Sequence, residues 1–151
     1  TGIQALDLLG RKSMELQGAG VQQVLGMIQS LCEEQANNAT LSEFIAPLAE
    51  KTREWQALTM EIGKKAVANA DEIGAASVDY LFYSGYVALA YWWTRSVVAA
   101  EAGASIETRT AKRETARFYF ARILPRTLAH AAAIRSGAAS LLALDATLFD
   151  T

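Results

Sequence analysis

An uncharged, aromatic-rich run of 15 residues lies between Asp79 and Arg95 and constrains the fold more than any other part of the sequence. At helical spacing, apolar side chains occupy every side of this run, so no wide polar face remains. The run is shorter than the roughly 20 residues that a helix needs to span a bilayer. Residues 78–100 are therefore predicted to form the central helix of a helical domain, with its apolar surface buried in protein.

The composition is that of a folded chain made of helices. The chain has 151 residues, of which 52% are hydrophobic and 20% charged, and 29 are alanine, the best helix former. No stretch shows the sustained alternation and β-branched enrichment of strands. The predicted fold class is all-α.

Apolar residues at helical spacing divide the chain into four long helices with short connections, which predicts an antiparallel four-helix bundle. A short N-terminal helix stub precedes the bundle at residues 3–9. The four bundle helices are expected at residues 21–35, at 40–69, at 71–103, and from Ser105 or Thr108 to about residue 143.

Local signals refine the expected helix ends. Thr40 and Glu43 match a capping box, in which a hydroxyl caps a free N–H and the glutamate reaches back. Asp71 is placed to cap the next helix. Pro47 is expected to kink its helix or to leave a short first segment, and Pro125 to kink the last helix without ending it.

The charge balance and the single cysteine exclude several classes of protein. The net charge of −2 and the pI of about 5.4 do not fit a dedicated nucleic-acid binder. No helix combines a dense basic face with a clean apolar face, so membrane attachment is not expected. One cysteine cannot form an intramolecular disulfide, and Asp7 interrupts the N-terminal apolar run of a would-be signal peptide. A cytoplasmic location is predicted.

Chemistry-bearing residues are few, and none forms a catalytic pattern. His130, the only histidine, is interpreted as a structural residue bonded to a backbone carbonyl, and Cys32 as a packed, inert thiol. One histidine and one cysteine offer no ligand spacing, so no metal site is predicted. Arg109, Arg113 and Arg117 are four residues apart and are interpreted as a solvated helix face, with a phosphate or an acidic partner as the alternative.

The N-terminal segment T-G-I-Q-A-L-D-L-L-G-R-K, residues 1–12, resembles the segment that follows the catalytic glutamate of acyl-CoA dehydrogenases. The family pattern there is Y-E-G-T-x-x-I-Q. Ile3 and Gln4 match its I-Q, and Thr1 and Gly2 occupy its two variable positions. The catalytic glutamate would therefore lie just before Thr1.

Two later stretches are similar to the extra C-terminal helical domain of one subgroup of this family. They are Y-L-F-Y-S-G-Y-V-A-L-A-Y-W-W at residues 80–93 and the stretch K-R-E-T-A-R-F-Y-F-A-R-I-L-P-R that opens residues 112–144. The subgroup includes 3-methylmercaptopropionyl-CoA dehydrogenase and acetyl-CoA-dehydrogenase-like enzymes. The resemblance covers nearly the whole chain and is weakest over residues 13–69.

The resemblance implies a division of the chain and a set of partners. Residues 1–12 would be the tail of the catalytic core, and residues 13–151 a C-terminal bundle domain that packs on the core and contributes to a homo-oligomer. The full enzyme would use FAD to oxidise an acyl-CoA to the 2,3-enoyl-CoA and would pass electrons to electron-transferring flavoprotein. Thr1 and Gly2 would be the flavin-contacting residues.

Two hypotheses follow for this chain. In the first it is a structural and oligomerisation domain with no catalytic residue and no bound FAD, inactive because the glutamate is missing. In the alternative it is a stand-alone bundle that binds an apolar ligand or a partner helix in a cavity lined by Tyr83, Tyr86 and Trp92.

Overall fold

A computed structural model describes residues 2–13, 19–144 and 146–149 of the chain. Every regular element in this part is helical. In chain order, the elements are α1 (Gly2–Leu6), a π-helical turn η1 (Asp7–Ser13), α2 (Ala19–Glu34), η3 (Ala39–Leu41), α3 (Ser42–Ala68), α4 (Asp71–Glu101), α5 (Ile106–Phe118), η4 (Tyr119–Ile123), η5 (Leu124–Arg126), α6 (Thr127–Ser136), α7 (Ala139–Leu142) and η6 (Ala146–Phe149).

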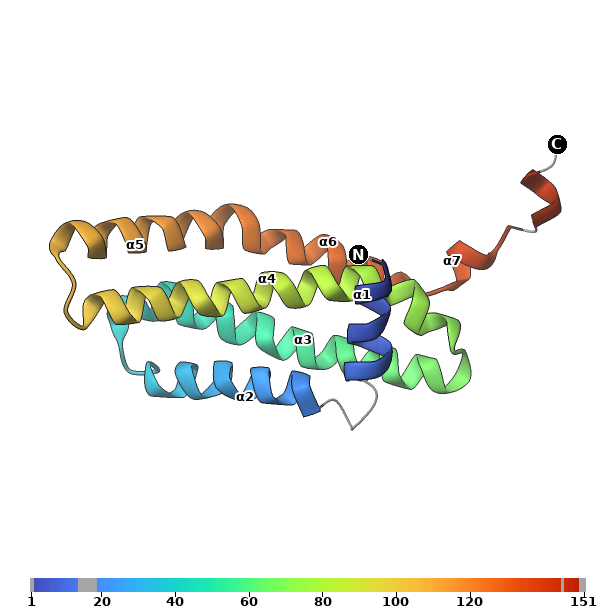
Figure 1. The fold of residues 1–151 in the computed structure, drawn as a ribbon, viewed down its shortest axis with the longest axis horizontal. Helices are drawn as coiled ribbons and strands as arrows, with labels where there is room; N and C mark the ends of the chain where they lie inside the picture. The colour runs from blue at the N-terminus through green and yellow to red at the C-terminus, as the bar shows by residue number, and fades with distance from the viewer. Residues whose placement is uncertain (1, 14–18, 145, 150–151) are drawn as a thin grey trace.

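The long helices α2, α3 and α4 and the combined α5–α6 rod run antiparallel, each in the opposite direction to the one before it (Figure 1). The stub α1 and the turn η1 cross α4 near its N-terminal end, and α7 extends away from the bundle at that same end (Figure 1). The predicted all-α antiparallel bundle with an N-terminal stub is confirmed. Part of the loop expected between the stub and α2 lies outside the described residues.

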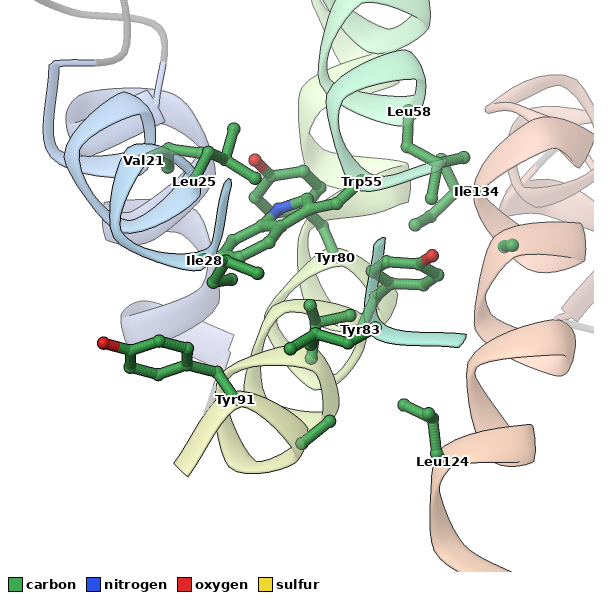
Figure 2. Close-up of a cluster of buried hydrophobic side chains, with 14 of the residues drawn as sticks. Val21, Leu25, Ile28, Trp55, Leu58, Tyr80, Tyr83, Tyr91, Leu124 and Ile134 are labelled. Atoms are coloured by element: carbon green, nitrogen blue, oxygen red, sulfur yellow. The ribbon is translucent and has the colours of Figure 1, made fainter. Parts of the chain in front are cut away.

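The main core is built where α2, α3, α4 and α6 face one another (Figure 2). Trp55 of α3 extends its ring toward Leu25 and Ile28 of α2, while Tyr80 and Tyr83 of α4 lie beside it, fully buried. Burying an aromatic or large aliphatic side chain contributes about 1.5–3 kcal/mol. The alternation of apolar positions at three and four residues along each helix is what brings these side chains to one axis.

The helix starts differ from two of the local predictions. Thr40 Oγ1 donates to Asn38 Oδ1 at 2.7 Å instead of capping α3, and Glu43 binds arginines of α5, so the predicted capping box is wrong. Asp71 does not cap α4 either; its own N–H donates to Asn69 Oδ1 at 3.1 Å. Ser105 does cap α5, where its Oγ accepts from the Thr108 N–H at 3.3 Å.

The two prolines have different consequences. α3 continues through Pro47 as one helix of 27 residues, so no separate first segment forms. Pro125 lies in η5, directly after the π-helical turn η4, and the chain then resumes as α6. The changed hydrogen-bond pattern accommodates the missing proline N–H, and the rod continues past Pro125, as expected.

Candidate functional site

The most distinctive surface of the molecule is the outward side of α4. Its inward side is buried against α3 and α6, as the sequence predicts. Its outward side carries seven residues spaced alternately four and three apart, which we call the outer stripe: Val78, Phe82, Gly85, Leu89, Trp92, Ser96 and Ala99. None of the seven is charged.

The outer stripe is open to solvent. Val78, Phe82, Leu89 and Trp92 are 41%, 44%, 50% and 56% exposed. Within this chain, the predicted burial of the helix is therefore found on its inward side only. The reason is geometric, because α2, α3 and the α5–α6 rod leave one side of α4 uncovered. A run of exposed apolar side chains of this length on one helix face is typical of an interaction surface.

A histidine–carboxylate pair borders the outer stripe. His130 Nδ1 lies 2.8 Å from Asp79 Oδ1, and the imidazole stacks on the rings of Phe82 and Tyr86 at centroid distances of 5.4 and 5.6 Å. The partner is thus a carboxylate of α4 and not the expected backbone carbonyl. Sequence reasoning missed Asp79, which lies 51 residues from His130 and has no local signal.

Two of the three arginines of the predicted row form an ion-pair network, in which Arg113 is half-buried while Arg117 stays exposed, as expected of a solvated face. Arg113 Nη1 binds Glu43 Oε1 at 2.9 Å and Arg113 Nη2 binds Glu101 Oε1 at 2.7 Å. Arg117 holds Glu43 through Nε at 2.8 Å and Nη2 at 2.9 Å. The hydrogen bond from Arg117 is the main reason that the pKa of Glu43 lies below its usual range. The network ties α3, α4 and α5 together, so these guanidinium groups are occupied within the domain.

A second polar cluster joins α3, α4 and α6 inside the bundle. The Tyr83 hydroxyl donates to Glu54 Oε2 at 2.9 Å, and Glu54 also binds Lys51 at 2.9 Å and Arg135 at 3.2 Å. Burial and the neighbouring carboxylate raise the pKa of Tyr83, so its hydroxyl stays protonated as a donor. This arrangement is structural, because every charged member already has an opposite charge within the domain.

Cys32 and the cavities provide no catalytic arrangement. Cys32 lies half-buried in a cleft of about 530 Å³ between α2 and α3, and burial raises the pKa of its thiol, which disfavours the nucleophilic thiolate. Tyr83, Tyr86 and Trp92 do not line a common cavity, because Tyr83 is fully buried whereas Trp92 belongs to the outer stripe. Within residues 2–13, 19–144 and 146–149, no cluster of three or more potential ligands could hold a metal ion.

Of the two predicted flavin contacts, Thr1 lies outside the described residues. Gly2 begins α1 and is exposed, and no other side chain of the described chain comes within 4 Å of the place of a Cβ. The space beside Gly2 is therefore open. In the described part of the chain, no helix is long and apolar enough to cross a membrane.

These features define a helical-bundle domain whose polar side chains serve its own packing and whose apolar outer stripe remains available to a partner. Residues 24–145 match the family model described as acetyl-CoA dehydrogenase C-terminal like, and the chain belongs to that family. The match supports a C-terminal domain of the acyl-CoA dehydrogenase type. No curated protein matches the chain.

Proposed function

We propose that this chain is the structural and oligomerisation domain of a flavin-dependent acyl-CoA dehydrogenase. The observation that carries the proposal is the family match over residues 24–145, together with an outer stripe that nothing in the described part of the domain covers. The whole enzyme would oxidise an acyl-CoA to the 2,3-enoyl-CoA, with 3-methylmercaptopropionyl-CoA dehydrogenase as the subgroup that the sequence resembles.

The domain would have a structural role and would contribute no catalytic residue. Residues 1–12 would continue a helix of the catalytic core, and residues 13–151 would form the appended bundle. FAD, the hydride acceptor of the whole enzyme, would be held chiefly by the core, with Thr1 and Gly2 at its edge. The open surroundings of Gly2 support this division, because a flavin site needs enclosing walls and nothing lies within 4 Å of a Cβ at Gly2.

The proposal is tested with the purified chain. We expect no flavin absorbance after incubation with FAD and desalting, and no reduction of an artificial electron acceptor with short- or medium-chain acyl-CoA. Catalytic turnover by the chain alone would overturn the proposal. Addition of a separately expressed catalytic core should give a complex in size-exclusion chromatography, and failure of the two to associate would contradict a structural role.

A further inference from the structure

The outer stripe has the spacing of a helix-pairing seam. Apolar or small residues alternate four and three apart from Val78 to Ala99, which is the a/d pattern by which two helices pack side by side. The stripe extends over 21 helical steps, or about 31 Å at 1.5 Å per residue. No charged side chain interrupts it. The pattern fits a straight partner helix better than a compact ligand.

We propose that a second copy of this chain covers the outer stripe, with its own α4 antiparallel to the first and a two-fold axis close to Leu89. The inference rests on the proposed oligomerisation function and assigns it a surface and a geometry. An isologous contact of this kind is self-complementary by symmetry, so the same stripe must serve as both halves of the interface.

The sizes of the side chains along the stripe are complementary in this antiparallel dimer. In the antiparallel register, Leu89 meets Leu89 of the second copy at the centre. On either side of the centre a large residue meets a small one, because the facing pairs are Gly85 with Trp92, Phe82 with Ser96, and Val78 with Ala99. Protein interfaces pack as densely as interiors, and alternating sizes allow this density without voids. A parallel pairing would instead set two Trp92 side chains against each other and two glycines opposite each other.

The partner helix accounts in particular for the presence of glycine at position 85. It lies in the middle of α4, where a glycine costs about 0.5–1 kcal/mol relative to alanine. A Cβ at this position would meet nothing within 4 Å, so the packing of the isolated domain does not require glycine there. The indole of Trp92 from the second copy, which is more than half exposed in this structure, would fill the space that the missing side chain leaves.

The N-terminal stub borders the outer stripe. A Cβ built on Gly10 of η1 would lie 3.7 Å from the Ile73 side chain, and Leu8 of η1 lines an apolar groove together with Leu81, Gly85 and Ala88 of α4. A partner helix on the outer stripe would therefore lie beside η1 at the level of Gly85.

The expected affinity is modest. An aromatic side chain buries about 150–250 Å² when it is fully covered. Phe82 and Trp92 are about half exposed, so covering them would bury roughly a further 100 Å² each. The stripe is thus smaller than the roughly 800 Å² per partner of a standard interface. A reversible dimer with a dissociation constant in the micromolar range is expected, and linkage within a larger enzyme would strengthen it through effective concentration.

The first test measures association and its dependence on Gly85. Sedimentation velocity of the chain from about 1 to 200 µM, a range that brackets micromolar affinity, should show a monomer–dimer equilibrium. Gly85→Leu should raise the dissociation constant at least tenfold without lowering the melting temperature of the monomer, because leucine fills the space intended for Trp92. Gly26→Leu is the matched control, since Gly26 is an exposed mid-helix glycine of α2 with nothing within 4 Å of a Cβ. A monomer at all concentrations, polydisperse aggregates, or equal effects of the two substitutions would overturn the proposal.

The second test determines the direction of pairing. In a Cys32→Ala background, Val78→Cys and Ala99→Cys are made as separate variants. A mixture of the two should form a disulfide-linked heterodimer under mild oxidation, whereas each alone should not, because a disulfide needs Cβ atoms about 3.5–4.5 Å apart. Cross-linking of each variant alone would show a parallel pair and overturn the antiparallel register. The flavin, acyl-CoA and core-binding assays on the same samples separate the two proposals, since an inactive monomer that still forms a complex with the catalytic core contradicts only the dimer.

Discussion

Glu43 is the residue on which the junction of α3 and α5 depends, and its replacement by glutamine is the most direct test of that conclusion. Its carboxylate accepts three hydrogen bonds from Arg113 and Arg117, 70 and 74 residues further along the chain. A glutamine at this position would keep the size of the side chain and one acceptor oxygen but would lose the charge. The two guanidinium groups would then lie side by side without their shared anion.

The magnitude follows from exposure and from the bonds that remain. An exposed ion pair contributes about 0.2–1 kcal/mol. The side chain of Arg113 is only 19% exposed and that of Glu43 is 36% exposed, so each pair should lie toward the upper end of this range. Arg113 keeps Glu101 and Arg117 keeps Glu114, so no charge is left without a partner. We therefore expect Glu43→Gln to destabilise the domain by about 1–2 kcal/mol, which lowers the melting temperature by roughly 3–6 °C in a chain of this size.

The assay is urea and thermal unfolding followed by circular dichroism at low ionic strength, with Glu50→Gln as control. Glu50 lies on the same helix but is 69% exposed, with its nearest cation, Lys51, at 3.7 Å. Its replacement should change stability by less than about 0.5 kcal/mol. A double-mutant cycle of Glu43→Gln with Arg117→Gln should give a positive coupling energy that shrinks in about 1 M NaCl. Equal effects of the two glutamate variants, or zero coupling, would refute the assignment of Glu43 as the hub.

Three further outcomes are expected. Tyr83→Phe removes a buried hydroxyl that donates to Glu54, and should cost about 1–2 kcal/mol in urea unfolding; no change would mean that the bond contributes nothing. Gly137→Ala should destabilise the domain by more than about 1 kcal/mol, because φ is +74° at this residue and a Cβ would lie 3.0 Å from a Glu72 oxygen. Gly26→Ala, in the middle of α2 with open space around it, should stabilise the domain. A higher melting temperature for Gly137→Ala than for Gly26→Ala would contradict both assignments. Hydrogen bonding from Arg117 lowers the pKa of Glu43 below its unfolded value of about 4.3, so the stability that the carboxylate contributes is complete above that pH and is lost as the pH falls through the lower folded pKa. The gap in melting temperature between wild type and Glu43→Gln should therefore close as the pH is lowered below about 4, and a constant gap would argue against the assignment.

The helices themselves could be predicted from the sequence because they depend on local periodicity. The bounds expected for the second and third bundle helices, 40–69 and 71–103, differ by no more than two residues from those of α3 and α4 at each end. The antiparallel order followed from the short connections. These features need no knowledge of what lies opposite each helix.

The polar contacts could not be predicted, because their partners are distant in the sequence. Glu43 matched a capping box three residues after Thr40, yet two arginines of α5 compete for the same carboxylate and offer charge-assisted bonds. His130 similarly pairs with Asp79 of α4. In both cases the side chain binds a partner on another helix instead of the partner that the local sequence suggests. Which residue becomes that partner depends on how the helices are aligned, and the sequence does not reveal this alignment.

The outer stripe shows how two sequence predictions constrain each other. Residues 78–100 were expected to be apolar on every side, and the chain was expected to form a four-helix bundle. In such a bundle each helix packs on its neighbours along one stripe and turns its opposite side outward. An all-apolar helix and a four-helix bundle are therefore compatible only if something outside the bundle covers that side. The structure places Phe82, Leu89 and Trp92 there, each about half exposed to solvent. The composition of α4 is thus accounted for by the proposed partner, and the open space at Gly85, where a Cβ would meet nothing within 4 Å, is where that proposal places the large side chain of Trp92 from the second copy.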